Sequence, residues 1–392
     1  MKRAVTILTI ALVGLNACTR TSLSPEKPEK GRQVQFTISP IKTTQTRAAD
    51  ITAFDQSQTF GSTAYAIDTT VNTSANWQNN SADATLTVIE NKEIKCQNGV
   101  WRAWNTTSGE AESYWWEDFA GKKLTFLSWY PMTFGNSNSL VNSDNLSITS
   151  QTSTIGSSTV HYKDFSYTGW KVSNTAGFGY TKDADGNKID DGSVDLLLAK
   201  SADCTEKNSS NGVLTQFYHQ LCNVKFYATI ADEPQSGEKW YVTKVEISDI
   251  YTKADLVSAA TQTEYRGIWR NHSDYYTYTY TPSSRIELVH TTPLTEKEIF
   301  PQTLMIPQSV ASTSTSTRKP TVTITYIDEN DETKTISGAL ATNSQTVTAW
   351  DAGKSITYTI SISTKEYPIE FSGSVSDWGS GSSTNINIGT DK

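Results

Sequence analysis

The stretch Val34-Gln35-Phe36-Thr37-Ile38 decides the fold, because three apolar residues alternate with two polar ones. This period of two places the apolar side chains on one face of an extended chain, which is typical of a half-buried β-strand. Pro40 ends the strand, since proline has no backbone N–H to donate to a neighbouring strand. We therefore expect a short first strand that covers one face of a sheet.

Similar short strands are expected along the whole chain. The clearest is Lys122 to Tyr130, which Pro131 stops. The other strand candidates are Ala84 to Ile89, Val194 to Ala199, Val213 to Leu221, Val224 to Ile230, Tyr241 to Ile247, Tyr275 to Tyr280, Thr321 to Ile327, Ser355 to Ile362 and Ile369 to Val375. Gly135 to Thr159 is rich in Ser, Thr, Asn and Gly and is interpreted as a long surface loop. Short strands separated by turns, with no sustained helical period, predict β-sandwich architecture.

Composition agrees with an all-β protein of two or three domains. Of the 392 residues, 10% are aromatic and roughly one in seven is Thr, and both kinds of residue suit a pleated, half-buried surface. Charged residues make up 19% and the formal net charge is −8, which argues against nucleic-acid binding because a basic face is needed to contact phosphates. A helical bundle, a disordered chain and a polytopic membrane protein are disfavoured.

The first 17 residues are interpreted as a signal peptide. Lys2 and Arg3 precede the apolar run Ala4 to Leu15, which is too short to span a bilayer as a permanent helix. The end of this run, Leu15-Asn16-Ala17-Cys18, resembles the lipobox of bacterial lipoproteins. The resemblance implies that Cys18 is acylated and becomes the first residue, and acyl chains on this cysteine would anchor the protein to a membrane. The alternative is an ordinary secretory signal with an incidental cysteine.

Residues 18–32 follow as a polar tether with little to bury. The remaining cysteines are Cys96, Cys204 and Cys222, an odd number in a compartment that permits disulfides. Cys204 and Cys222 could pair, or all three could be small buried residues. Their spacing does not suggest a zinc site.

Several landmarks occur in an order that resembles the fimbrillin-like proteins, the subunits of type V pili. After the lipobox and the first strand comes Thr46-Arg47-Ala48. The later landmarks are Trp129-Tyr130-Pro131, Asp195 to Ala199, Phe217 to Leu221, Leu304 to Gln308, Trp350 to Ile360 and Ile369 to Trp378. Each motif is weak alone, and their order over nearly the whole chain makes the resemblance.

The resemblance implies two tandem transthyretin-like β-sandwich domains of Ig-like, Greek-key type. The polar segment Ser201 to Gly212 suits the boundary, which gives an N-terminal domain of residues 48–204 and a C-terminal domain of residues 205–392. In this family an arginine-specific protease removes the lipidated leader with its first strand, and another subunit's strand fills the groove. The resemblance places the removable segment at residues 33–47, with cleavage between Arg47 and Ala48.

Physical chemistry supports the same scheme. Removing Val34, Phe36 and Ile38 would leave an apolar slot and two rows of unpaired backbone groups, which an incoming alternating strand satisfies. The C-terminus offers a candidate donor with Ile386 and Ile388, which follows the flexible segment 379–383. The alternative for this tail is a final strand of its own domain.

Two other clusters could carry binding chemistry. Asp183-Ala184-Asp185-Gly186-Asn187 opens like a calcium loop but has Lys188 where that loop needs Gly, and a hairpin tip explains it equally well. Trp101, Trp104, Trp115 and Trp116 lie near Glu117 and Asp118 and could contact a glycan, although core and strand-edge packing is the simpler explanation. We predict no metal site.

The sequence favours no enzyme and no cofactor, because no GxSxG elbow, phosphate-binding loop or dinucleotide motif is present. His219 alternates with Phe217 and Leu221 and is expected to be a satisfied core histidine. We expect a fimbrial subunit, tip or anchor component at the outer membrane and cell surface. Its expected partners are other fimbrial subunits, the membrane through its lipid, and a host or microbial surface ligand. The alternative is an anchored lipoprotein that binds glycans through its Trp-rich loops.

Overall fold

The computed structural model describes residues 31–39, 56–77, 86–105, 107–132, 146–155, 157–172, 180–182, 188–190, 195–230, 239–258, 265–289, 295–311, 318–341, 347–362, 370–377 and 384–388. Strands make up nearly all the regular structure of these residues, together with one turn of 3-10 helix, η2 (Trp116–Phe119). The all-β fold class is therefore confirmed. Within the described ranges, no helix is long and apolar enough to span a membrane.

The N-terminal half of the chain forms one large sheet in the order β12-β1-β4-β3-β2-β6-β11-β13, with β5 paired to β4. Its strands are β1 (Phe36–Ile38), β2 (Thr59–Asp68), β3 (Leu86–Gln97), β4 (Val100–Asn105), β5 (Glu110–Ala111), β6 (Lys122–Tyr130), β11 (Leu197–Cys204), β12 (Val213–Thr215) and β13 (Tyr218–His219). Asn98 and Gly99 connect β3 to β4 with positive φ angles of 54° and 77°, as the tightest hairpin turns require.

The C-terminal lobe, to which residues 146–171 of the first half of the chain also contribute, contains two sheets. One has the order β21-β20-β15-β8-β7, with β16 and β17 also paired to β15, and the other has the order β18-β14-β23-β24-β25. The strands are β7 (Leu146–Ile155), β8 (Ser158–Lys171), β14 (Cys222–Ile230), β15 (Trp240–Ser258), β16 (Gly267–Tyr280), β17 (Ile286–Leu288), β18 (Lys297–Met305), β20 (Thr321–Ile327), β21 (Thr333–Ala339), β23 (Lys354–Ile362), β24 (Glu370–Asp377) and β25 (Thr384–Ile388). Two short ribbons complete the list: β9 (Tyr180–Lys182) with β10 (Lys188–Asp190), and β19 (Gln308–Ser309) with β22 (Ala349–Trp350).

The strand predictions are largely confirmed, and one loop prediction is wrong. The bounds of β6 and β20 agree residue for residue with the expected strands. The segment 146–159, expected within a long loop, instead forms β7 and the start of β8. The two strands pair from Leu146 opposite Tyr167 to Ile155 opposite Ser158. The threonines on either side suit strands, because they are β-branched.

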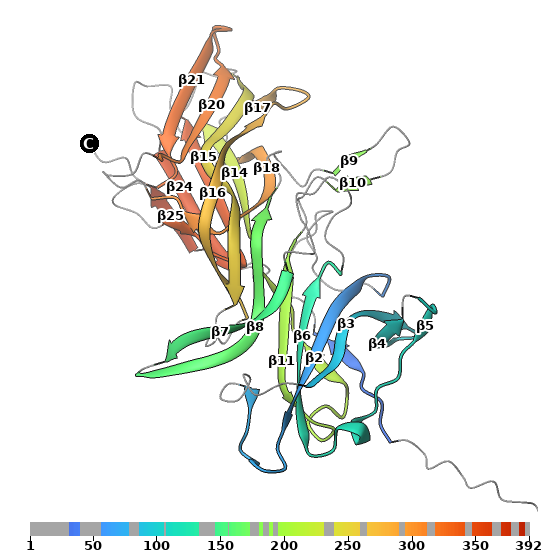
Figure 1. Cartoon of the computed structure of the whole chain (residues 1–392). Coiled ribbons are helices and arrows are strands. Elements are labelled where there is room, and N and C mark those ends of the chain that lie inside the picture. The colour runs from blue at the N-terminus through green and yellow to red at the C-terminus, as the bar shows by residue number, and fades with distance from the viewer. Residues whose placement is uncertain are drawn as a thin grey trace, which may run out of the picture.

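The two halves share strands across the expected domain boundary. Figure 1 shows β8 rising from the projecting β7–β8 hairpin into the sheet of the C-terminal lobe, where it pairs with β15 from Lys171 opposite Lys253 to Ser166 opposite Val257. Conversely, β12 and β13 follow residue 204 in the chain but belong to the N-terminal sheet. Each lobe therefore contains strands from both sides of the expected boundary.

The hydrophobic core consists of three clusters of buried side chains. One fills the N-terminal lobe and one the C-terminal lobe. The third lies at the junction and includes Leu127 and Leu198 of the N-terminal sheet, Trp170 of β8, Leu256 of β15 and Ile306 after β18. This shared cluster joins the lobes through apolar burial, which is the main stabilising term in folding.

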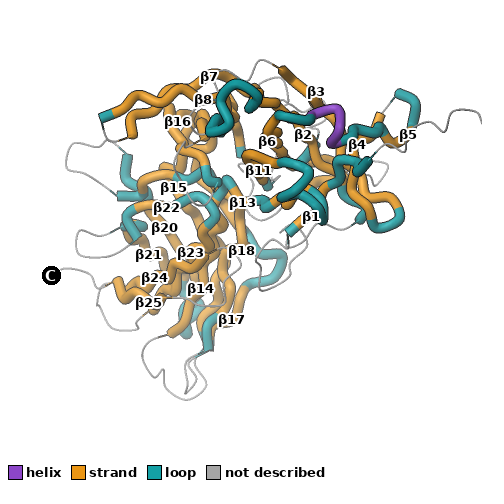
Figure 2. The backbone as a smooth tube through the Cα atoms, turned by 90° about the horizontal axis from the view of Figure 1, so that it is seen from below, coloured by secondary structure: helices purple, strands orange, loops and turns teal. Residues whose placement is uncertain are grey.

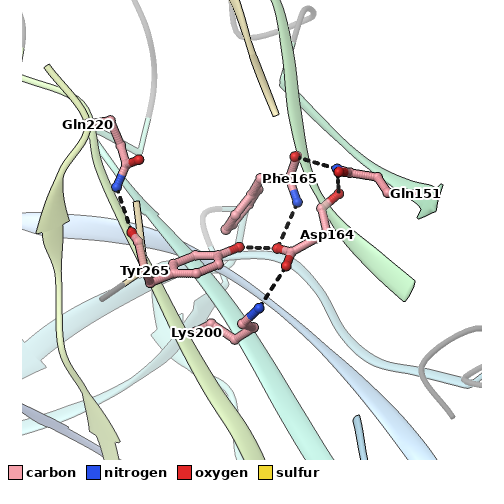
Figure 3. Close-up of polar contacts among 6 residues, drawn as sticks. All are labelled: Gln151, Asp164, Phe165, Lys200, Gln220 and Tyr265. Atoms are coloured by element: carbon pink, nitrogen blue, oxygen red, sulfur yellow. Dashed lines mark hydrogen bonds and ion pairs between the residues drawn. The ribbon is translucent and has the colours of Figure 1, made fainter. Parts of the chain in front are cut away.

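A buried polar cluster, which we call the junction cluster, lies beside this shared core (Figure 3). The Asp164 carboxylate on β8 is fully buried, and one of its oxygens lies 2.8 Å from Lys200 Nζ on β11. Its other oxygen accepts hydrogen bonds from the Phe165 N–H, at 2.9 Å, and from the Tyr265 hydroxyl. Lys200 Nζ also lies 4.5 Å from the centre of the Tyr265 ring. Burial and the Asp164 charge hold the pKa of Tyr265 well above its usual value, so the phenol stays a hydrogen-bond donor.

Cys96, Cys204 and Cys222 are free thiols. Burial raises the pKa of the Cys204 thiol to about 11 and raises the pKa of Cys222 well above its ordinary value. Cys96 is only half-buried. The expected alternative of small buried residues therefore describes Cys204 and Cys222, which do not pair.

The junction cluster makes a first testable prediction. Asp164→Ala is expected to lower the free energy of unfolding by about 3–5 kcal/mol, because it leaves a largely buried Lys200 ammonium without its counter-charge. Asp118→Ala, at an exposed carboxylate, serves as control and should change it by less than about 0.5 kcal/mol. Denaturant unfolding followed by tryptophan fluorescence measures both. Equal midpoints for Asp164→Ala and wild type would show that the pair does not stabilise the junction.

The cysteines make a second prediction. Because the thiolate is the reactive form, alkylation of the native protein at neutral pH should label Cys96 first and leave Cys204 and Cys222 unmodified. Mass spectrometry of peptides from native and denatured samples measures the difference. Labelling of Cys222 at the rate of Cys96 would contradict the buried position of this thiol.

Candidate functional site

The first strand lies in the interior of the N-terminal sheet rather than at its edge. β1 pairs in parallel with β12, with Phe36 opposite Val213, and antiparallel with β4, with Phe36 opposite Trp101. Figure 2 shows β1 within the N-terminal lobe, on the side away from β7 and β8. Two segments that are far apart in the sequence, β4 and β12, therefore lie on either side of β1. We call the space between them the slot and the two strands its walls.

Backbone hydrogen bonds hold the segment around β1 from both sides. On one side the Val34 N–H donates to the Tyr114 carbonyl at 2.7 Å, and the Trp116 N–H donates to the Arg32 carbonyl at 3.0 Å. On the other side the Val213 N–H donates to the Gln35 carbonyl at 2.7 Å. Removing this segment would expose donors and acceptors along both walls, and unpaired buried groups of this kind cost free energy.

The side chains of β1 alternate as expected. Val34 and Phe36 are 5% and 4% exposed, and Ile38 packs partly buried against the same core. The Phe36 ring meets Phe60 and Phe126 edge to face, with ring centres 5.8 and 5.4 Å apart. The slot therefore has an apolar floor as well as polar walls.

The wall formed by β12 depends on β1. Among the described strands, β12 pairs only with β1, and the Thr37 hydroxyl donates to the Asn211 carbonyl. Gly212 allows this close approach, because a Cβ at this position, where φ is +100°, would lie 2.5 Å from the Thr37 oxygen. Beyond it, the Ser201 hydroxyl donates to the Leu214 carbonyl at 2.7 Å. β1 thus connects β4 to β12, and β12 contacts β11 at the opposite end of the sheet.

The expected processing sites lie outside the described residues. These are Cys18 for lipidation, Arg47 and Ala48 for cleavage, and the loop Asp183 to Asn187 considered for calcium. In the described part of the chain, no group of three or more His, Cys, Asp or Glu side chains could hold a metal ion. His219 is buried, with Nδ1 2.6 Å from an Asp195 oxygen, as expected of a core histidine.

The C-terminal candidate donor forms β25 of this chain's own sheet. It pairs with β24, with Ile386 opposite Gly373 and Ile388 opposite Phe371, and lies at the end of the strand order. This is the arrangement expected of a final strand of its own domain. A strand held by one neighbour is also the easiest to release, so the prediction of a donor stays open.

The four tryptophans separate into two pairs. Trp101 and Trp116 are 9% and 4% exposed and belong to the N-terminal core. Trp104 and Trp115 are half-buried, and Lys95 Nζ lies 5.4 Å from the centre of the Trp104 ring. Only Trp104 and Trp115 therefore present ring surface to a glycan, and Trp101 instead forms part of the slot around β1.

Sequence reasoning identified the strand but not its neighbours. A strand is expected from Val213 to Leu221 without a particular partner, and no strand is expected around Trp101, which lies opposite Phe36 on the other side. Parallel pairing between Phe36 and Val213 leaves no local sequence pattern, because the two segments are far apart in the chain. The junction cluster around Asp164 was likewise not expected.

Comparison with known proteins places this geometry in a family. The sequence model of the family described as fimbrillin-like matches residues 46–378. A fimbrial protein from Bacteroides vulgatus has a similar structure, with a TM-score of 0.55 and 14% identity over 89% of this chain and 100% of that chain. No curated protein has a significant match.

Two further solved structures have lower TM-scores. A putative cell adhesion protein from Bacteroides uniformis has a TM-score of 0.43 and 16% identity, covering 88% of this chain and 99% of that chain. The tip fimbrial protein Mfa3 from Porphyromonas gingivalis has a TM-score of 0.32 and 9% identity, covering 82% and 95%. The family match extends over most of the chain, and the chain therefore belongs to the fimbrillin-like family.

Proposed function

We propose that this chain is a fimbrial subunit that is exported as a lipoprotein, cleaved after Arg47 and joined to its neighbours by strand exchange. The observation that supports the proposal is the position of β1, a short alternating strand between β4 and β12. The Arg47 peptide bond follows this strand, so one cut separates it from the rest of the fold.

After β1 has left, a slot filled by another strand has a lower free energy than an empty slot. Burial of each large apolar side chain contributes about 1.5–3 kcal/mol, and both Val34 and Phe36 are buried. Backbone groups on both walls need partners as well. An incoming alternating strand satisfies all of these groups, and the leader strand keeps the slot filled until the chain reaches the cell surface.

The proposed donor of this chain is the tail that carries Ile386 and Ile388. In the free subunit it is held only by β24 at the edge of a sheet, and it follows the Gly- and Ser-rich segment 379–383. Release therefore breaks the pairing with one neighbour, whereas insertion into another subunit's slot creates two. Acylation of Cys18 would hold the precursor at the outer membrane until cleavage.

Cleavage makes the third prediction. On cells that produce the wild-type chain, the mature protein should begin at Ala48 and occur in SDS-resistant, high-mass complexes. Arg47→Ala should retain the acylated Cys18 terminus and run as a monomer. Arg32→Ala, upstream in the same leader, is the control and should mature normally. Mass spectrometry of the terminus and unboiled gels test both, and complexes formed equally by Arg47→Ala would refute the cleavage step.

The packing of the Phe36 side chain of β1 in the core makes the fourth prediction. In the uncut chain, Phe36→Ala should lower the free energy of unfolding by about 3–5 kcal/mol, because it empties a packed aromatic site. Gln35→Ala, between the two buried positions, should have little effect because its contribution to the slot is through the backbone. Denaturant unfolding compares them. Equal stability of the two variants would mean that β1 does not complete the core.

A further inference from the structure

The floor of the slot is built from aromatic rings. Phe60 and Phe126, which meet Phe36 edge to face at interplanar angles of 84° and 83°, are both fully buried. Phe217 and Trp101 extend the group, with ring centres 5.2 and 5.7 Å from Phe60. We call Phe60, Phe126, Phe217 and Trp101 the aromatic cage.

The two rings of the cage that meet Phe36 lie on strands that do not pair with β1. Phe60 lies on β2 and Phe126 on β6, two adjacent strands in the middle of the sheet that pair from Gly61 opposite Trp129 to Asp68 opposite Lys122. Since packed interiors relax only partially around a missing side chain, departure of Phe36 leaves a site of the size and shape of one aromatic ring. The buried position just before β1, occupied by Val34, is a smaller site.

We infer that the strand accepted in place of β1 carries an aromatic residue at the position of Phe36 and a smaller apolar residue two positions before it. This inference rests on the proposed function and adds the chemical identity of the partner strand. An aliphatic side chain would leave part of the cage empty and would lose the edge-to-face contacts, which stabilise beyond the area they bury.

The chain's own tail does not satisfy this requirement. The apolar residues of the tail strand are Ile386 and Ile388, and neither is aromatic. The tail strand of a second copy would therefore underfill the cage with either isoleucine at the position of Phe36. The partner that fills the slot is a different subunit whose donor strand carries an aromatic residue, so this chain occupies a junction between unlike subunits instead of repeating in a homopolymer.

Strand exchange on the whole chain tests the inference. The protein is cut after Arg47 with its leader still seated, and labelled peptides compete for the slot. The peptides are Arg32 to Ser39, the same peptide with Phe36→Ile, and Ser382 to Gly389 from the tail. A peptide with Thr37→Ser, changed at an exposed position, is the matched control. Because the changes are in the peptides, the fold of the protein is unaffected.

The expected result is capture of the natural and Thr37→Ser peptides with similar affinity. The Phe36→Ile and tail peptides should bind at least about tenfold more weakly. Equal capture of the tail peptide would overturn the aromatic requirement and leave strand exchange intact. Capture of none of the peptides, including the natural sequence, would overturn both the requirement and the proposed exchange.

Discussion

The structure depends on one constraint: a strand in the interior of a sheet must be bonded along both backbone edges. β1 meets it with β12 on one side and β4 on the other, while its apolar residues complete the core below. Removal of a strand at an edge breaks one row of backbone hydrogen bonds. Removal of β1 breaks two rows and leaves a cavity in the core. The same strand therefore both completes the N-terminal lobe and, once cut from the chain, becomes a part that another strand must replace.

β11 links this site to the junction between the lobes. Its neighbouring residues alternate between two cores: Leu197 and Ala199 pack with the cluster that holds Phe36, and Leu198 packs with the shared cluster. The next residue, Lys200, forms the ion pair with Asp164 on β8. Because β8 continues into the C-terminal sheet, any force on a strand seated in the slot reaches the second lobe through packed side chains and hydrogen-bonded strands. No single flexible connection has to carry it.

The sequence was sufficient for the fold class and for many strand positions, since period-two alternation and proline stops are local signals. Lys122 to Tyr130 was predicted to the residue for this reason. Pairing between distant segments was not predictable: the neighbours of Phe36 come from positions 101 and 213, and no local pattern encodes that register. The loop prediction for residues 146–159 failed because Ser and Thr occur in both loops and solvent-exposed strands. For Trp101, core or strand-edge packing was the simpler explanation, and its burial agrees with it, but the sequence could not show which face of β4 is covered.

The two ends of the fold differ in a way that gives the proposed assembly a direction. The tail strand β25 pairs with β24 alone, so moving it into a slot between two walls exchanges one row of backbone hydrogen bonds for two. The reverse transfer, from slot to edge, loses one row and reopens an apolar site. Strand exchange between subunits of this kind is therefore favoured in one sense only, from the edge of the donor to the interior of the acceptor. Because β1 fills the slot and is bonded on both sides, the exchange also requires that the leader strand leave after the cut.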